Sequence, residues 1–233
     1  NAMKIALAQI NPTVGDFGGN LRRIARAVRR AEEGGARLCI LPEMCIPGYP
    51  ARDLLLDRRF VDDNLRALDR LARMVGAMPV VAGFIDRNPS AVGKGLFNAG
   101  AVIRGGAVRD VFRKMLLPTY DVFDEPRYFD PAGRVTVSEV DGARVGFTIC
   151  EDIWNVPELW TRRFYAADPV EMLVKKGAEM IVNISASPFT IGRCALRHAI
   201  ARRIAARHRI PVYYVNQVGG NDQLVFDGRS FAI

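Results

Sequence analysis

The chain has 233 residues, of which 49% are hydrophobic and 25% are charged, and its formal net charge is +8. This is an ordinary globular composition with enough apolar residues for one large core or two small ones, and no apolar run approaches the roughly 20 residues of a membrane-spanning helix. The charge raises the possibility of nucleic-acid binding, but the arginines are scattered over predicted helix faces without aromatic residues to stack on bases, which favours solvated surfaces.

The first half of the chain alternates short apolar runs, which predict strands, with apolar stripes at helical spacing, which predict helices. In chain order we expect a strand at 4–10, a helix at 20–33 that Gly34-Gly35 ends, a strand at 37–41 and a helix at 60–75. Strands then follow at 79–85, 98–103 and 107–113, and the last two are joined by the turn Arg104-Gly105-Gly106.

The second half opens with a predicted hairpin of strands 135–140 and 143–149 across Asp141-Gly142. A helix at 169–176, a strand at 180–185, a long helix at 192–208, a strand at 212–216 and a strand-like segment at 223–233 follow. Hairpins mixed with strand–helix units predict an α/β protein whose sheets carry helices on their outer faces. No Pro/Ser/Gly-rich linker divides the chain, so we expect one domain from residue 3 to residue 233, and we interpret Asn1-Ala2 ahead of Met3 as a tag remnant.

Four cysteines, Cys39, Cys45, Cys150 and Cys194, show neither a CxxC pair nor zinc-ligand spacing, and a disulfide scaffold would be smaller and denser in Cys. Reduced thiols and a start without a signal peptide predict a cytoplasmic protein. Each cysteine is therefore considered singly.

Polar residues stand where predicted strands end. Glu43 follows the strand at 37–41, Lys114 the strand at 107–113, Cys150 the strand at 143–149, and Ser187 the strand at 180–185. The carboxyl edge of an α/β sheet is where such proteins assemble their sites.

These residue types form a plausible set for thiol catalysis. A thiol needs a base to become a nucleophile, and because His198 and His208 both fall on the long basic helix, a carboxylate base is the better candidate. Glu43 would take the Cys150 proton and later deliver it to a leaving amine. Lys114 would stabilise the tetrahedral oxyanion together with the backbone N–H that follows the nucleophile.

Other interpretations of the cysteines stay open at this point. Cys39 lies inside an apolar strand and Cys194 in the first turn of a helix, where packing is the simpler role, while Cys45 lies in the same loop as Glu43 and is a second candidate nucleophile. Glu151-Asp152 would oppose a Cys150 thiolate if they pointed inward, so the context of Cys150 alone does not decide between nucleophile and packing.

Three motifs in chain order resemble those of the nitrilase (carbon–nitrogen hydrolase) superfamily: Leu41-Pro42-Glu43, the stretch from Phe112 to Pro118 around Lys114, and the stretch from Gly146 to Trp154 around Cys150. The resemblance implies an α/β fold built as a four-layer αββα sandwich, with Glu43, Lys114 and Cys150 as catalytic residues. It also implies pairing of sandwiches into αββααββα dimers, and so a homo-oligomer.

Within the superfamily, residues 117–129 and 183–189 are similar to the glutaminase domain of glutamine-dependent NAD synthetases. That likeness implies that Tyr120, Ser187 and Arg193 contact glutamine and that Glu125 supports the lysine. Arg193 stands where many of these domains carry lysine, and its planar fork suits a substrate carboxylate. Without the likeness, Ser187 reads as a cap before Pro188 and Arg193 as a solvated helix charge.

The resemblance implies hydrolysis of the L-glutamine side-chain amide through a Cys150 thioester, with ammonia passed to a synthetase domain that makes NAD from deamido-NAD. No cofactor is implied for the glutaminase domain itself; ATP and Mg²⁺ are implied only for the synthetase domain, whose Ser-Gly-Gly-type loop we do not find in this sequence. We therefore expect a C-terminally incomplete glutaminase domain without its synthetase domain, and neither nucleic-acid nor membrane partners. The alternatives are a stand-alone amidase or carbamoylase and a catalytically silent ammonia-delivery or assembly module.

Overall fold

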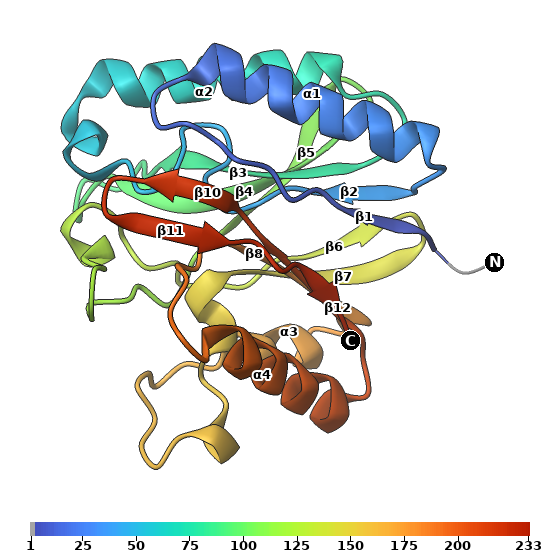
Figure 1. Ribbon diagram of the computed structural model, residues 1–233, viewed down its shortest axis with the longest axis vertical. Coiled ribbons are helices and arrows are strands. Elements are labelled where there is room, and N and C mark those ends of the chain that lie inside the picture. Colours follow the sequence, from blue (N-terminus) through green and yellow to red (C-terminus); the bar gives the residue numbers. More distant parts are fainter. Residues whose placement is uncertain (1–2) are drawn as a thin grey trace.

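The computed structural model describes residues 3–233, so the interpretation of Asn1-Ala2 as a tag remnant falls outside the described residues. Figure 1 shows the two five-stranded sheets stacked face to face, with helices covering the outer face of each. The predicted α/β class is confirmed, with sheets flanked by helices in the layer order αββα. No helix among these residues is long and apolar enough to cross a membrane.

The first sheet has five strands in the order β1-β2-β3-β4-β5. Strands β1, β2 and β3 run parallel, whereas β3, β4 and β5 are joined as antiparallel hairpins. Helices α1 and α2 cover its outer face. The bounds are β1 Ile5–Leu7, α1 Phe17–Glu33, β2 Leu38–Ile40, α2 Arg58–Met74, β3 Val80–Arg87, β4 Leu96–Arg104 and β5 Ala107–Arg113.

The second sheet also has five strands, in the order β12-β9-β8-β7-β6, and α3 and α4 cover its outer face. Strands β7, β8 and β9 are parallel, β6 and β12 are antiparallel to their neighbours, and β10 and β11 form a separate hairpin. The bounds are β6 Val137–Val140, β7 Ala143–Ile149, α3 Pro169–Lys175, β8 Met180–Ser185, α4 Arg193–His208, β9 Val212–Asn216, β10 Val218–Asn221, β11 Leu224–Asp227 and β12 Phe231–Ala232.

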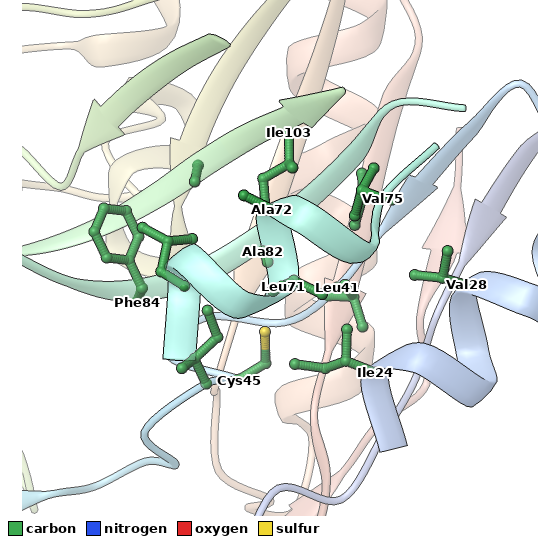
Figure 2. Packing of buried hydrophobic residues seen from close by; sticks show 14 of the residues in the cluster. Ile24, Val28, Leu41, Cys45, Leu71, Ala72, Val75, Ala82, Phe84 and Ile103 are labelled. Atoms are coloured by element: carbon green, nitrogen blue, oxygen red, sulfur yellow. The ribbon is translucent and has the colours of Figure 1, made fainter. Parts of the chain in front are cut away.

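Apolar side chains fill each of the three interfaces between layers. Beneath α1 and α2, Ile24 and Leu71 pack with Phe84, and Cys45 lies among these side chains (Figure 2). Between the sheets, the rings of Phe112 and Phe147 stack with centroids 4.7 Å apart. Each fully buried side chain of this size contributes about 1.5–3 kcal/mol to the stability of the fold. The three interfaces together therefore stabilise the stacking of the four layers.

The predicted elements are confirmed with shifted ends, apart from two differences. The segment predicted at 223–233 is two strands, β11 and β12, which belong to different sheets. Strand β10 was not predicted, because it contains Gly219-Gly220 and glycine is depleted in strands. The helix predicted from residue 20 begins earlier, at Phe17, because the Asp16 carboxylate accepts a hydrogen bond from the Gly19 N–H (2.8 Å) and caps α1. The same helix ends at Gly34, followed by Gly35 with a φ of +71°, as expected for a glycine stop.

Candidate active site

The predicted strand ends do converge. Strands β2, β3 and β5 point the same way, because β2 is parallel to β3 and β4 is antiparallel to both β3 and β5. The loops after β2 and β5 carry Glu43 and Lys114, and Cys150 directly follows β7 in the other sheet. A hydrogen bond from the backbone N–H of Ala186, just after β8, to Glu43 Oε2 (2.7 Å) joins the ends of the two sheets.

Glu43 is fully buried and held through both oxygens. Asn98 Nδ2 (2.7 Å) and Lys114 Nζ (2.9 Å) donate to Oε1, and the Ala186 N–H donates to Oε2. The loop that carries Glu43 passes so close to β3 that a Cβ on Gly83 would lie 2.2 Å from the Met44 nitrogen, so only glycine fits there. A carboxylate restrained in this way keeps one orientation.

Lys114 lies between two carboxylates with only 1% of its side chain exposed. Its Nζ lies 2.9 Å from Glu43 Oε1 and 2.8 Å from Glu125 Oε1, and Tyr49 OH donates to the same Glu125 oxygen (2.9 Å). Burial alone would lower the pKa of Lys114, but Glu125 and Glu43 outweigh it and hold that pKa well above its ordinary value. Burial raises the pKa of Glu125, against the effect of Lys114. The lysine is therefore a fixed positive charge.

Cys150 opens a short 3₁₀ turn (Cys150–Ile153) with a φ of +44°, in the left-handed region that non-glycine residues rarely occupy. Asn183 Nδ2 contacts the Cys150 carbonyl oxygen at 3.4 Å and Thr148 Oγ1 at 3.0 Å, which helps to hold this conformation. Burial and the Glu43 charge raise the pKa of the Cys150 thiol well above its ordinary value, while the Lys114 charge opposes them. These surroundings favour the neutral thiol, which would need a base to act as a nucleophile.

The two acids after Cys150 both point inward, and each has its own partners. Asp152 accepts from three backbone amides, those of Ile149 (2.9 Å), Leu116 (2.9 Å) and Met115 (3.0 Å), which ties the end of β7 to the segment after Lys114. Burial raises its pKa to about 7 even though these amides and Lys114 act in the opposite direction.

Glu151, the residue after Cys150, lines a cavity of about 740 Å³. Its carboxylate accepts hydrogen bonds from Tyr120 OH (2.7 Å) and Tyr165 OH (3.0 Å), and burial raises its pKa. The Arg193 guanidinium lies 5.0 Å from the centre of the Trp154 ring in the same cavity. The cavity is lined by Thr119, Tyr120, Glu151, Trp154, Trp160, Phe164, Tyr165, Thr190, Ile191, Gly192, Arg193 and Leu196. It therefore presents one carboxylate and one guanidinium on largely apolar walls.

Ser187 does not line this cavity. Its side chain is buried, its Oγ accepts from Arg197 Nε (3.2 Å), and its backbone N–H donates to Asn216 Oδ1 (2.8 Å). Of the residues implied to contact glutamine, the structure thus places Tyr120 and Arg193 at the cavity and Ser187 in the turn behind the site.

The remaining cysteines differ from Cys150 in their surroundings. Cys39 and Cys45 lie in the core under α1 and α2, and burial raises the pKa of each thiol to about 12. Cys45 Sγ lies 3.6 Å from the Gly83 carbonyl oxygen, within the core rather than at the cavity. Cys194 is partly buried in the first turn of α4, as its helix position predicts. Among residues 3–233, no group of three or more His, Cys, Asp or Glu side chains is placed to hold a metal ion.

Several residues that build the site were not singled out from the sequence. Asn98 and Asn183 each interrupt an otherwise apolar strand. An amide side chain at such a position could have identified them from the sequence, because a buried amide needs hydrogen-bond partners. Arg197 stands three, four and seven positions before Ile200, Ala201 and Ile204, so it occupies the apolar face of α4. Other arginines of the helices, such as Arg22 in α1 and Arg202 in α4, are exposed, as expected for solvated helix faces.

Comparison with known proteins identifies one family and relatives that share a single name. The family model described as carbon-nitrogen hydrolase matches residues 4–233. Two proteins named glutamine-dependent NAD(+) synthetase, from Synechocystis sp. PCC 6803 and Thermotoga maritima, are 41% and 40% identical over 98% and 99% of this chain. The chain spans only 42% and 38% of the length of these relatives.

Solved structures show the same likeness. A glutamine-dependent NAD+ synthetase from Acinetobacter baumannii, solved in complex with ADP, superposes with a TM-score of 0.88 and 34% identity over 99% of this chain and 41% of its own. An amidase from Nesterenkonia sp. shares the fold, with a TM-score of 0.80 and 24% identity over 99% of this chain and 82% of its own.

Proposed function

Because the chain belongs to the carbon–nitrogen hydrolase family, we propose that it hydrolyses the side-chain amide of L-glutamine to glutamate and ammonia. The observation that carries the proposal is the buried Glu43–Lys114–Cys150 group, in which Cys150 is followed directly by Glu151, a residue that lines the same cavity as Arg193. The relatives named glutamine-dependent NAD(+) synthetase support the same substrate. We also propose that the ammonia serves ATP-dependent NAD synthesis in a synthetase domain, and that the protein acts in the cytoplasm as a homo-oligomer.

The arrangement supports a mechanism in two halves. Glu43 takes the Sγ proton as Cys150 attacks the amide carbon, and the positive charge of Lys114 stabilises the oxyanion. The protonated Glu43 then gives its proton to the nitrogen, so that ammonia leaves and a γ-glutamyl thioester remains. Glu43 next removes a proton from water, which attacks the thioester and releases glutamate and the thiol. Glu125 keeps Lys114 in place through its 2.8 Å contact.

The cavity supports recognition of an amino-acid head group. Glu151, which two tyrosine hydroxyls orient, suits an α-ammonium group, and Arg193 suits an α-carboxylate. We propose that Tyr120 lies against the bound substrate, since its ring lines the cavity while its hydroxyl holds Glu151. Ser187 lies in the turn after β8 and outside the cavity lining. It would therefore contact only the part of the substrate that reaches deepest into the site.

Thioester trapping tests the proposal. The protein is incubated with L-glutamine and hydroxylamine, which intercepts a γ-glutamyl thioester as the hydroxamate, and intact mass is measured after rapid acid quenching. We expect ammonia release, hydroxamate formation and an acyl adduct on Cys150, all lost in Cys150→Ala. Cys194→Ala is the matched control, because it removes a partly exposed thiol outside the cavity lining.

A panel of amides separates glutamine from other substrates. Glutamine, glutaramate, which lacks the amino group, and simple aliphatic amides are compared by their kcat/KM. Preference for a simple amide over glutamine would replace the proposed substrate with that of a stand-alone amidase. Turnover with an unmodified Cys150 would contradict the mechanism itself. Activity that appears only after a synthetase partner is added would indicate an ammonia-delivery module.

A further inference from the structure

Arg197 differs from the other arginines of α4 because its side chain is only 1% exposed. Its Nη1 atom forms an ion pair with Asp227 Oδ1 of β11 at 2.6 Å, so the charge is compensated inside the protein. A buried arginine without such a partner would be strongly destabilising. The hydrogen bonds from its Nε and Nη2 atoms all go to one turn of the chain.

That turn joins β8 to α4. Arg197 Nη2 donates to the carbonyl oxygens of Ser187 (2.9 Å) and Pro188 (2.8 Å), and Nε donates to Ser187 Oγ (3.2 Å). Asn216 holds the same turn from the other side, since its Nδ2 donates to the Ser187 carbonyl at 3.1 Å. The planar fork of arginine satisfies several acceptors at once, which the single ammonium of lysine does not reproduce.

The first residue of this turn, Ala186, contacts Glu43. Ala186 N–H donates to Glu43 Oε2 at 2.7 Å, and Ser187 comes directly after Ala186 in the chain. The guanidinium is thus separated from the general base by one short segment of backbone. Asp227 extends the connection to the β10–β11 hairpin, whose Val225 carbonyl accepts from the Phe189 N–H at 2.7 Å.

We propose that Arg197 is a positioning residue for the reaction: it clamps the 186–188 turn so that the Ala186 N–H stays on Glu43 and Ser187 stays at the inner end of the site. It does not touch the reacting atoms. Its effect on Cys150 passes through Glu43, which Asn98, Lys114 and Ala186 together orient. A displacement of the base by about 1 Å is enough to cost about a hundredfold in rate.

The test uses alkylation of Cys150 by iodoacetamide, followed by mass spectrometry at each cysteine. Iodoacetamide has no amino-acid head group, so its rate reports on the base and the thiol, not on glutamine binding. Glu43→Gln gives the rate without a working base. Arg197→Lys keeps the charge opposite Asp227 but loses the fork, and Asp227→Asn weakens the same clamp from β11.

Arg144→Gln is the matched control. Arg144 also donates to two backbone carbonyls, those of Gly177 (2.9 Å) and Lys176 (2.6 Å), but it lies at the opposite end of β7 from Cys150. Its loss should lower the melting temperature without a connection to Glu43. Folded fraction and melting temperature are measured for every variant by circular dichroism.

We expect Arg197→Lys to slow Cys150 alkylation in the folded protein by roughly tenfold or more, toward the Glu43→Gln rate, and Asp227→Asn to slow it less. Arg144→Gln should stay within about twofold of the unchanged protein even if it melts earlier. Folded Arg197→Lys, or folded Asp227→Asn where the lysine variant does not fold, with an unchanged alkylation rate would overturn the proposal. Since the assay contains no glutamine, a slowed alkylation in a protein that does not hydrolyse glutamine would overturn only the proposed substrate.

Discussion

Replacing Lys114 by methionine would leave two carboxylates facing each other inside the protein. Lys114 Nζ lies 2.9 Å from Glu43 and 2.8 Å from Glu125, and both carboxylates are buried. Breaking a buried ion pair by removing one partner costs about 3–5 kcal/mol. In a protein of this size each kcal/mol lowers the melting temperature by about 2–4 °C, so we expect Lys114→Met to melt about 6–20 °C earlier.

The loss should depend on pH in a definite direction. Burial already raises the pKa of Glu125, and removing Lys114 takes away the largest effect that lowers it while the Glu43 charge stays. A carboxyl whose folded pKa lies above its unfolded value destabilises the fold as pH rises through that interval, because the unfolded chain has already released its proton. Lys114→Met should therefore regain stability relative to the unchanged protein as pH falls from 8 toward 5.

Thermal unfolding followed by circular dichroism across that pH range measures both effects. Lys175→Met is the control, because Lys175 forms a 3.3 Å pair with Glu171 in which both side chains are well exposed, and such a pair contributes about 0–1 kcal/mol. Adding Glu125→Gln to Lys114→Met should restore part of the lost stability by removing one of the two charges. A Lys114→Met variant that melts within about 3 °C of the unchanged protein at every pH would refute the reasoning.

Three further predictions concern single carboxylates. Asp152→Asn cannot accept from all three backbone amides, so it should destabilise the fold by about 1–3 kcal/mol in urea unfolding, and an unchanged unfolding midpoint would contradict this. Glu151→Gln should raise the KM for glutamine about ten- to a hundredfold while leaving the kinetics with glutaramate, which lacks the amino group, nearly unchanged. Asp130→Ala frees the backbone amides of Lys94 and Gly95, so trypsin should cut after Lys94 faster with no change in Cys150 alkylation; equal cleavage rates would show that Asp130 does not order this loop.

The sequence was sufficient for the elements and for the edge of the sheets that carries the site. Apolar runs and helical spacing are local properties, so most elements were predicted within a few residues. Places at strand ends were a weak signal for Glu43, Lys114 and Cys150, and the three motifs that resemble the nitrilase superfamily made these residues the candidates. The partners that orient these side chains are not local. The Ala186–Glu43 hydrogen bond spans 143 positions of the chain, and nothing in either residue's neighbours specifies that the two sheets meet there.

Two arginines of α4 show the same limit of prediction from local sequence. Arg197 and Arg202 are chemically identical and stand on one helix, yet one is buried against Asp227 and the other is exposed. Their positions relative to the apolar stripe of α4 distinguish them, but composition and charge do not. A buried charge is retained only with a compensating partner, and that partner comes from a hairpin of which one strand was not predicted.

The two acids after Cys150, which left its role undecided from sequence, clarify the mechanism once their partners are known. Glu151 is held by two tyrosines at the cavity and Asp152 by three backbone amides, so each of the two carboxylates has hydrogen-bond partners other than Cys150. The Glu151 charge nevertheless adds to burial and Glu43 in raising the pKa of Cys150. A permanent thiolate–lysine pair is disfavoured in such surroundings, because the lysine is already paired with two carboxylates. In the proposed mechanism the proton moves to Glu43 as Cys150 attacks, and the restraint on both oxygens of that carboxylate fits this role.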